Sequence, residues 1–354
     1  MAPQENSQTL EKCDEQYALS ISSGSLAIAE ESITYSPTKP QLFGEISAWE
    51  RMESRLPEVL PATRVVGIPN GIVVGSASWV VTPDLKVVVP LSWYESVESK
   101  PSLSKVTWNK MHYVKGNVLN LGTISGWNNY GHFLLDGIGR LSVLELTGKT
   151  ISDFDRVVVP GFSSPSANRL LETVGISSEK IIRLSAGEAL YGDALYTPSL
   201  PGTSRIYRAC LPEFFRSQVS SKLSDKKIFI SRPAGRRPIS NIEELENCLT
   251  QHDFEIVDPH EVFLPQLIAE ADVVVGAHGA ALADIAFAKK GTKVIELIPS
   301  DHMFPYYYSL ATAGELEYRL VLGKSEYVRE LDESGPSPHP FEVDIDAFEL
   351  ALNK

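Results

Sequence analysis

The chain has 354 residues, of which 43% are hydrophobic and 22% charged, and this composition is typical of a globular protein with material for two hydrophobic cores. Its formal net charge of -13 argues against a nucleic-acid backbone or an anionic membrane surface as the main partner, because the average surface would repel either one. Anionic ligands must therefore be bound by local clusters of arginine.

The sequence carries no signal-peptide pattern and no run of about eighteen apolar residues, so it predicts neither export nor membrane insertion. The cysteines Cys13, Cys210 and Cys248 are odd in number and form no C-x-x-C pair, which favours free thiols in a reducing compartment over a disulfide framework or a zinc site. We therefore expect a cytoplasmic protein. Peripheral membrane association and the oligomeric state stay open.

The first part of the chain divides into a leader and an α/β domain. Residues 1–45 are polar and rich in Ser and Glu, which predicts a loosely ordered leader. Short β-rich runs between residues 64 and 94 are separated by turn signals, as in a β-meander. Strand and helix patterns then alternate, with a helix expected over 130–146, and this alternation is typical of a parallel sheet covered by helices. We assign residues 46–200 to an N-terminal α/β domain.

A proline- and glycine-bearing segment at 198–203 marks the domain boundary. Residues 204–333 then repeat the alternation of strands and helices, which predicts a second α/β domain. Residues 334–354 are read as a proline-bearing linker and a terminal helix. The elements expected in the second domain are strand 227–232, helix 242–251, strand 254–257, helix 260–269, the strand–turn–helix–strand unit 271–299 and strand 318–322.

The strand–turn–helix unit carries the clearest functional signal. Val273–Val275 is a β-branched run of the kind buried in parallel sheets, and Gly276 and Gly279 allow a tight turn before a helix expected over Ala280–Lys289. The N-terminus of a helix after a glycine-rich turn suits a phosphate group. An ordinary strand-to-helix turn has the same pattern, so this segment alone leaves both interpretations open.

A second candidate lies in the predicted helix 130–146. His132, Asp136 and Arg140 are spaced four apart and would share one polar face that points away from the core. A histidine beside a carboxylate is a plausible general base for a hydroxyl, and the neighbouring glycines suggest that a ligand approaches the backbone closely. The alternative is a solvated helix face with a simple His–Asp pair.

The third candidate is the segment 231–237, at the carboxyl end of the first strand of the second domain. Arg232, Arg236 and Arg237 could bind a diphosphate there, since ligands of doubly wound sheets bind at that edge. The alternative is a basic surface loop. Glu296 interrupts an apolar strand, and we expect it at the end of the strand, accepting hydrogen bonds from ribose hydroxyls. The alternative is pairing within the protein, with an Arg or a backbone turn.

Two D-x-D patterns, Asp153–Asp155 and Asp344–Asp346, have the spacing of metal-dependent sugar transfer. Each stands just before a regular element, where acidic residues serve as caps or turn residues. We therefore assign no metal to either pattern.

Three motifs together resemble glycosyltransferase family 61. They are N-Y-G-H-F-L-L-D at 129–136, I-S-R-x-x-x-R-R at 230–237 followed by Asn241 and Glu243, and A-D-V-V-V-G-A-H-G-A-A-L at 271–282. Their order and approximate spacing match that family over roughly residues 125–300. The resemblance implies the GT-B architecture, in which two Rossmann-like domains face each other across a cleft, and inverting transfer without an obligatory metal or other cofactor.

The resemblance also implies roles for individual residues. The donor diphosphate would be bound by the arginines together with His278, Gly279 and Ala280, and the ribose by Glu296. His132 and Asp136 would act at the reacting centre, with Asn129, Tyr130 and Arg140 positioning the acceptor. Asp284 departs from the family pattern, which often has Asn there, so it either faces away from the diphosphate or the local contact differs.

We therefore expect an inverting transferase that moves a sugar from a nucleotide-diphosphate donor, with uridine as the base that the resemblance favours, to a hydroxyl of a glycan or glycoconjugate. Golgi members of the family carry a membrane anchor, and its absence from this sequence suggests a soluble, bacterial-type enzyme of polysaccharide synthesis. The alternatives are a nucleotide-sugar epimerase of the same fold and a non-catalytic nucleotide- or sugar-binding protein.

Overall fold

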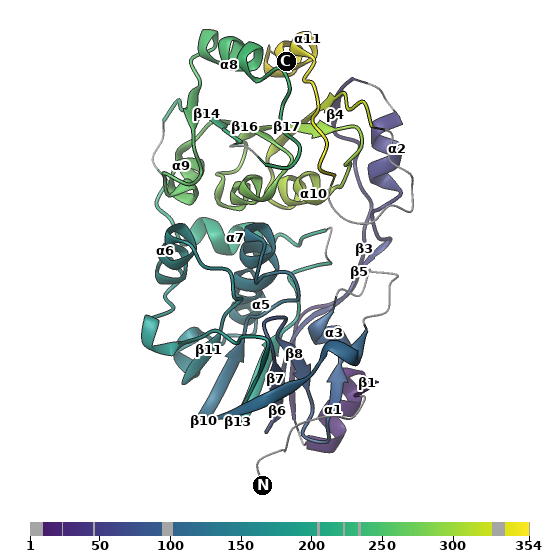
Figure 1. Ribbon diagram of the computed structural model, residues 1–354, viewed down its shortest axis with the longest axis vertical. Coiled ribbons are helices and arrows are strands. Elements are labelled where there is room, and N and C mark those ends of the chain that lie inside the picture. Colours follow the sequence, from purple (N-terminus) through teal and green to yellow (C-terminus); the bar gives the residue numbers. More distant parts are fainter. Residues whose placement is uncertain are drawn as a thin grey trace. The chain divides into compact units, whose positions relative to one another are not determined.

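The structure is a computed structural model that describes residues 10–22, 24–44, 47–93, 102–203, 206–221, 224–232, 235–327 and 337–353. Residues 1–9 of the predicted leader, Ser204 at the predicted boundary and residues 334–336 of the predicted linker lie outside these ranges. The chain is a mixed α/β protein that divides into two compact units, and both contain a sheet with parallel strands (Figure 1).

Unit 1 comprises Met1–Thr34 and Val59–Ser204, and its large sheet has an antiparallel and a parallel part. The antiparallel part contains a β-meander of β7, β8 and β9, which are joined by short turns and pair antiparallel in that order. The strand β6 pairs antiparallel with β13 and β2 instead of β7, and the outer neighbour of β9 is the parallel strand β1. In the parallel part, β10 lies between β13 and β11, and β11 pairs with β12. The strands are β1 (Glu11–Cys13), β2 (Ser25–Glu30), β6 (Thr63–Pro69), β7 (Ile72–Val74), β8 (Trp79–Val81), β9 (Lys86–Val88), β10 (Trp108–Asn120), β11 (Arg156–Val158), β12 (Ile181–Ile182) and β13 (Gly187–Pro198), with the small pair β3 (Ile33–Thr34) and β5 (Val59–Leu60) outside this sheet.

The predicted helix 130–146 connects the adjacent parallel strands β10 and β11, but it is not one regular α-helix. It begins as a single α-turn, continues as π-helix and ends as α-helix. Gly137 in the π-helical part leaves room for Pro160, because a Cβ there would lie 2.4 Å from Cγ of that proline. The helices of unit 1 are α1 (Glu15–Ser22), α3 (Val89–Ser92), α4 (Tyr130–His132), the π-helical η2 (Phe133–Ile138), α5 (Arg140–Leu146) and α6 (Pro165–Thr173), with the 3₁₀ turns η1 (Leu103–Lys105), η3 (Ile151–Asp153) and η4 (Ser178–Lys180).

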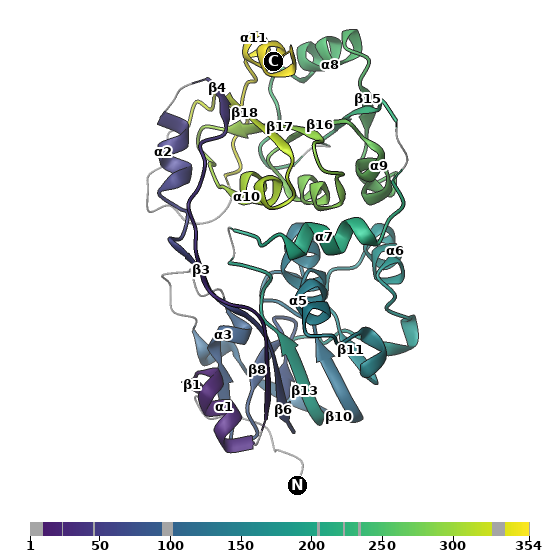
Figure 2. The same ribbon diagram turned by 180° about the vertical axis from the view of Figure 1, so that it is seen from behind.

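Unit 2 comprises Tyr35–Glu58 and Arg205–Lys354 and is built on a parallel sheet. The strand order is β15-β14-β16-β17-β18-β4, which can be followed from edge to edge in Figure 2. Every neighbouring pair in this sheet is parallel, and its central strands are buried, as the apolar β-branched runs predict. The strands are β14 (Lys227–Ile230), β15 (Glu255–Val257), β16 (Val273–Ala277), β17 (Lys293–Pro299), β18 (Glu317–Gly323) and β4 (Gln41–Phe43).

Helices cover both faces of this sheet (Figure 1). The first group, α8 and α11, closes a core around Phe229, Val275, Ile295 and Phe348. The second group lies on the other face, where η5 packs against α7, α9 and α10. The helices of unit 2 are α2 (Ser47–Glu53), α7 (Cys210–Ser217), α8 (Ile242–Gln251), α9 (Leu264–Glu270), the 3₁₀-helical η5 (Ala280–Phe287), α10 (Tyr306–Ala313) and α11 (Ile345–Asn353).

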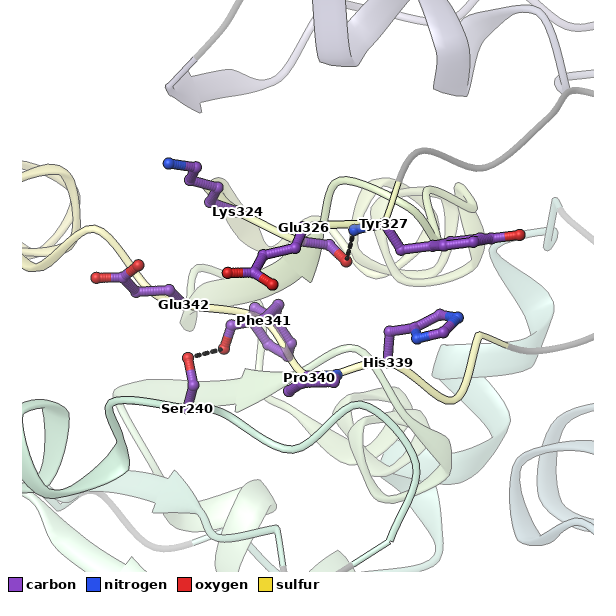
Figure 3. Close-up of a pocket in the computed structure, with 9 residues that line it drawn as sticks. Ser240, Lys324, Glu326, Tyr327, His339, Pro340, Phe341 and Glu342 are labelled. Carbon is purple, nitrogen blue, oxygen red and sulfur yellow. Dashed lines mark hydrogen bonds between the residues drawn. The ribbon is translucent and has the colours of Figure 1, made fainter.

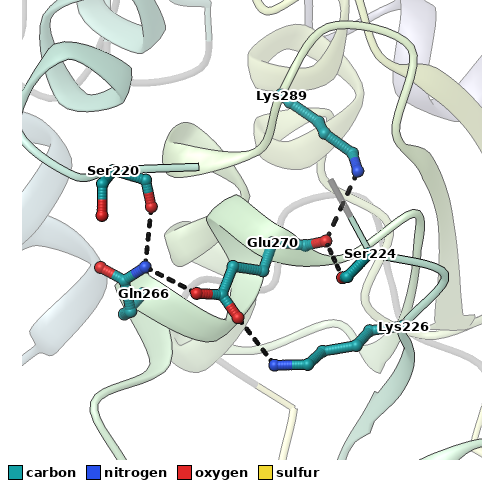
Figure 4. Close-up of polar contacts among 6 residues, drawn as sticks. All are labelled: Ser220, Ser224, Lys226, Gln266, Glu270 and Lys289. Atoms are coloured by element: carbon teal, nitrogen blue, oxygen red, sulfur yellow. Dashed lines mark hydrogen bonds and ion pairs between the residues drawn. The ribbon is translucent and has the colours of Figure 1, made fainter. Parts of the chain in front are cut away.

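A polar network around Glu270 fastens the segments that lead into β14 and β16 (Figure 4). The Glu270 carboxylate accepts from Lys226 Nζ at 2.7 Å and from Gln266 Nε2 at 3.0 Å. Its backbone oxygen accepts from Ser224 Oγ at 2.7 Å and from Lys289 Nζ at 3.5 Å. These contacts hold the amino ends of both strands in place, opposite the edge where their carboxyl ends open.

The N-terminal part of the chain differs from the expectation of a leader without regular structure. Within residues 10–44 the structure has β1, α1, β2, β3 and β4, and β4 completes the edge of the sheet in unit 2 by pairing with β18. Segments this short carry too few residues to show a hydrophobic period. The domain division expected from the sequence, with boundaries at 46, 200, 204 and 333, stays a prediction.

Candidate functional site

The sheet of unit 2 has one point where the strand order reverses. The chain leaves β14 to form β15 on one side and then returns to form β16 on the other side. Loops that leave neighbouring strands in opposite directions open a crevice at the carboxyl ends, which is where doubly wound folds bind their ligands. Arg232 lies two residues after the end of β14, and His278 follows β16 directly, so these two of the predicted donor residues lie at this point.

Arg232 is fixed by backbone carbonyls. Its Nη1 donates to the oxygen of His278 at 2.7 Å, and its Nε donates to the oxygen of Arg236 at 2.8 Å. The guanidinium also needs Gly279, because a Cβ at that position would lie 2.4 Å from Nη1. The φ of Gly279 is 178°, which any residue can adopt, so the close approach of Arg232 is the reason for glycine here.

Arg237 adds a second, more deeply buried guanidinium. Its backbone has a φ of 55°, which is uncommon for a residue with a side chain, and its Nη1 donates to the Ser337 oxygen at 3.3 Å. Burial, and then the charge of Arg232, lower the pKa of Arg237 to about 10. Within the described residues, neither Arg232 nor Arg237 forms an ion pair with a carboxylate, and Nε of Arg237 is buried without a hydrogen-bond partner.

We call Arg232, Arg236 and Arg237 the arginine cluster. Arg236 is exposed, whereas the other two are held by the protein. Buried guanidinium groups without a carboxylate partner are costly, and a bound anion would remove much of that cost. The arrangement therefore fits a phosphate or diphosphate at the carboxyl edge of the sheet.

His278 is linked to a buried chain of side chains. Its Nδ1 lies 2.5 Å from Oε1 of Glu296, and the Tyr318 hydroxyl donates to Oε2 of the same carboxyl group. Burial, and then the charges of Arg237 and Arg232, lower the pKa of His278 well below its usual value. Burial raises the pKa of Glu296 to about 8, although the hydrogen bond from Tyr318 opposes this change.

These directions favour a protonated Glu296 beside a neutral His278. In that arrangement the carboxyl group donates to Nδ1, and the imidazole carries its hydrogen on Nε2. A neutral imidazole with hydrogen on Nε2 is a hydrogen-bond donor, which suits a phosphate oxygen as partner. The protonation state of Glu296 therefore determines which nitrogen of His278 carries the hydrogen.

The expected position of Glu296 at the end of its strand is wrong. Glu296 lies in the middle of β17 with an exposed fraction of 0%, and both of its carboxylate oxygens contact side chains of the protein. Pairing within the protein was the alternative interpretation, but the partners are His278 and Tyr318 instead of an arginine or a backbone turn. The strand pattern does not reveal them, because Tyr318 lies on the neighbouring strand β18.

The turn after β16 begins the short helix η5. It starts at Ala280, as predicted, but it is a 3₁₀-helix that ends at Phe287. The Tyr307 hydroxyl donates to the oxygen of Gly279 at 2.6 Å, so α10 holds the turn from the opposite side. Asp284 is only 2% exposed within η5, so its carboxylate faces the protein interior.

The second group of predicted site residues lies in unit 1, at the start of the connection from β10 to β11. The Asn129 side chain caps α4 by accepting from the His132 backbone N–H at 3.2 Å. Nδ1 of His132 lies 2.5 Å from Oδ2 of Asp136, and the imidazole is 28% exposed, whereas Asp136 is 1% exposed. Burial lowers the pKa of His132, but the hydrogen bond and the negative charge of Asp136 outweigh it, so the pKa lies above its usual value. In this His132–Asp136 pair a buried carboxylate holds a partly exposed imidazole, which is an arrangement that a general base requires.

Aromatic rings stand beside this pair. The Tyr130 ring stacks on Phe133 at 6.2 Å between centroids and lies 5.8 Å from the ring of Phe162. Trp127, earlier in the same loop, is 48% exposed. Partly exposed rings near a base are the kind of surface on which a sugar packs, so Tyr130 remains a candidate for acceptor positioning.

The prediction that helix 130–146 turns a polar face away from the core is wrong. Arg140 is 2% exposed, and its guanidinium donates to backbone oxygens of three segments, at Asp136 (3.1 Å), at Leu91 (3.2 Å) and at Pro198. The π-helical stretch is buried on all sides, so the face is not solvated. Arg140 fastens the helix to its surroundings, and the expected acceptor contact stays untested.

A further pocket of about 510 Å³ lies beyond the carboxyl end of β18 (Figure 3). The Tyr327 and His339 rings stack there with centroids 4.2 Å apart. Lys324 and Glu342 exchange two backbone hydrogen bonds of 2.8 Å at its wall. Sequence reasoning did not find this pocket, because its walls come from three segments that no motif connects. Its lining residues are Ser240, Lys324, Ser325, Glu326, Tyr327, His339, Pro340, Phe341 and Glu342.

Asp153 and Asp344 have the capping roles expected for them, whereas Asp155 bonds to a residue far away in the sequence. Asp153 accepts from the Thr150 N–H at 2.7 Å, Asp155 accepts from the Asn117 N–H at 2.8 Å, and Asp344 accepts from the Ala347 N–H at 3.0 Å.

None of the helices in the described part of the chain combines the length and the apolar composition that crossing a membrane requires.

Comparison with known proteins agrees with the three sequence motifs. Residues 130–295 match the family model described as Glycosyltransferase 61. A segment of 65 residues is 38% identical to the beta-1,2-xylosyltransferase RCN11 of Oryza sativa subsp. japonica. That segment is 18% of this chain and 12% of the rice protein, so the similarity covers a small part of either one.

Proposed function

Because the chain belongs to glycosyltransferase family 61, we propose that it transfers a sugar from a nucleoside-diphosphate sugar to a hydroxyl group of a glycan or glycoconjugate, with inversion at the anomeric carbon. We further propose a uridine diphosphate donor and the GT-B architecture, in which donor and acceptor are bound by different Rossmann-like domains. The observation that carries this proposal is the arginine cluster at the point of reversal in the sheet of unit 2.

The donor diphosphate is the proposed ligand of this edge. Arg232 and Arg237 would neutralise its charge, while Nε2 of His278 and the first N–H groups of η5 would donate to its oxygens. Gly279 leaves the space in which the Arg232 guanidinium lies. The same groups would stabilise the leaving diphosphate as negative charge develops on it.

The His132–Asp136 pair is the proposed catalytic base. Nδ1 of His132 is engaged by Asp136, which leaves Nε2 to accept the proton of the acceptor hydroxyl. The acceptor oxygen forms a bond to the anomeric carbon while the bond from that carbon to the diphosphate oxygen breaks. We propose that this displacement needs no metal or other cofactor, because the arginines supply positive charge at the leaving group.

The test is to incubate the protein with a panel of nucleotide-sugars, with and without glycan acceptors, and to measure the release of nucleoside diphosphate. UDP-xylose belongs in this panel because the name of the rice relative specifies xylosyl transfer. Acceptor-dependent release supports the proposal, and the anomeric configuration of the product determines whether transfer inverts. Conversion of the sugar without diphosphate release would indicate an epimerase, and binding without any turnover of the panel would favour a non-catalytic protein.

A further inference from the structure

Three side chains with metal-binding atoms meet on the face of the unit 2 sheet that α8 and α11 cover, where these two helices pack against each other. Cys248 lies in the last turn of α8, His252 is the C-cap residue of that helix four positions later, and Glu349 belongs to α11. Sγ of Cys248 lies 3.6 Å from Oε1 of Glu349, and Nε2 of His252 lies 4.0 Å from the same oxygen. All three ligand atoms lie within 4.8 Å of one another.

These separations are close to those of a tetrahedral zinc site. Zinc bonds of about 2.3 Å to sulfur and about 2.0–2.2 Å to nitrogen and oxygen place ligand atoms roughly 3.3–3.7 Å apart. The Sγ–Oε1 distance of 3.6 Å already agrees, and the Nε2–Oε1 distance of 4.0 Å requires a shift of well under an ångström. Rotation of the His252 and Glu349 side chains provides this, because they are 31% and 46% exposed.

The charge around Cys248 also favours a cation. Oε1 of Glu349 lies 3.6 Å from Sγ of Cys248, and Glu244 on the same helix adds a second negative charge nearby. The Glu244 carboxylate is positioned by Asn241, whose Nδ2 donates to it at 3.1 Å. A divalent cation bound here would replace the proton of the Cys248 thiol, which would then be a thiolate ligand, and that proton would pass to solvent.

We propose that Cys248, His252 and Glu349 form a zinc-binding site that ties the terminal helix α11 to α8. The combination of thiolate, imidazole and carboxylate is one that zinc uses, and water would fill the fourth position. Phe348, beside Glu349, is completely buried in the core of unit 2, so a metal at this place would hold α11 on that core. The site is separate from the carboxyl edge of the sheet, and its role is structural.

The test uses the full chain after removal of metal. Zinc is titrated in competition with a chromophoric chelator, and cobalt is added as a spectroscopic substitute. We expect saturable binding of one zinc ion, a melting temperature that rises with zinc concentration, and a thiolate-to-cobalt charge-transfer band. Cys248→Ser should abolish that band and weaken zinc binding on the order of 100-fold, while Glu349→Gln should weaken it by about tenfold or more.

Cys210→Ser is the matched control, because Cys210 is another buried cysteine of unit 2 that lies outside this group, and it should leave zinc affinity unchanged. Failure of the unsubstituted chain to bind zinc would overturn the proposal, as would equal affinity of the Cys248→Ser variant. If the Cys248→Ser variant does not fold, the zinc affinity of Glu349→Gln provides the test, since the partly exposed Glu349 side chain can change without loss of packing. Unaltered affinity in Glu349→Gln would then reject the site.

Discussion

Substituting Gly279 with alanine should displace the Arg232 guanidinium, although Arg232 itself is not mutated. The new Cβ would lie 2.4 Å from Nη1 of Arg232, so the guanidinium must move by about 1 Å to reach an ordinary contact distance. Nη1 donates to the His278 oxygen at 2.7 Å, and a shift of this size breaks that hydrogen bond. A displaced guanidinium would no longer be aligned for its proposed hydrogen bond to the diphosphate, and losing a hydrogen bond that involves a charged group costs about 1.5–3 kcal/mol of binding free energy.

The expected result has two parts. Isothermal titration calorimetry should show UDP affinity reduced roughly 10- to 150-fold in Gly279→Ala, which is that energy expressed as a ratio, and Arg232→Ala should reduce it to a similar extent. The double variant should be no worse than Arg232→Ala alone, because φ of Gly279 suits any residue and the only obstacle has been removed. Gly276→Ala, near the end of β16, is the control, since its Cβ would lie 3.1 Å from Cδ1 of Leu282 and 3.7 Å from two atoms of Ile230, and none of these nearest atoms belongs to Arg232.

Additive losses in the double variant would refute this reasoning. They would mean that alanine at position 279 acts on the ligand or the backbone independently of Arg232. Undiminished UDP binding in Arg232→Ala would reject the guanidinium as a diphosphate ligand altogether.

The other predictions concern the catalytic pair, pH and metal. His132→Ala should lower kcat by roughly two to four orders of magnitude and leave UDP affinity nearly intact, with a smaller loss in Asp136→Asn; the reverse ranking in steady-state kinetics would make Asp136 the base. Because the folded-state pKa of His132 is raised, its contribution to stability is fully present below the unfolded pKa and is lost as pH rises through the folded pKa, so urea unfolding of Asp136→Asn should lack this pH dependence. UDP affinity should fall as pH rises through about 8, where Glu296 ionises and Nε2 of His278 loses its hydrogen, and Glu296→Gln should bind UDP at pH 7 but show no such fall in calorimetry. Activity of the Cys248→Ser variant should survive EDTA, and a loss that manganese restores would contradict metal-independent transfer.

The sequence predicted the parts of this structure that local patterns encode. The β-meander, the strand β14, the helix α8 and the unit around β16 all have clear hydrophobic periods and turn residues, and each of them is present. Arg232, Gly279 and His278 could be grouped before the structure was known, since parallel strands end at the same edge of a sheet.

The contacts that sequence reasoning missed join residues far apart in the chain. Glu296 pairs with His278 and Tyr318, which belong to different strands, and a single sequence does not show which neighbour will compensate a buried carboxylate. Arg140 was placed on an exposed face because a regular helix was assumed, whereas the π-helical stretch is buried throughout. Cys248 was read as an isolated thiol, because its partner Glu349 comes from the last helix.

The short strand β4 has a consequence for how the protein is made. Gln41 pairs with Arg319, so 278 residues (319 minus 41) separate the two sides of this pairing. A ribosome that adds about 5–20 residues per second needs roughly 14–56 s between them, and during that time the outer edge of the second sheet cannot close. Bringing two such distant segments together costs loop-closure entropy before any stabilising contact between them has formed. The pairing of β4 with β18 therefore belongs to the last steps of folding. Nascent chains would then pass through a stage in which β18 is formed and its outer edge is still unpaired, and this stage, more than the finished protein, is where chaperones would be needed.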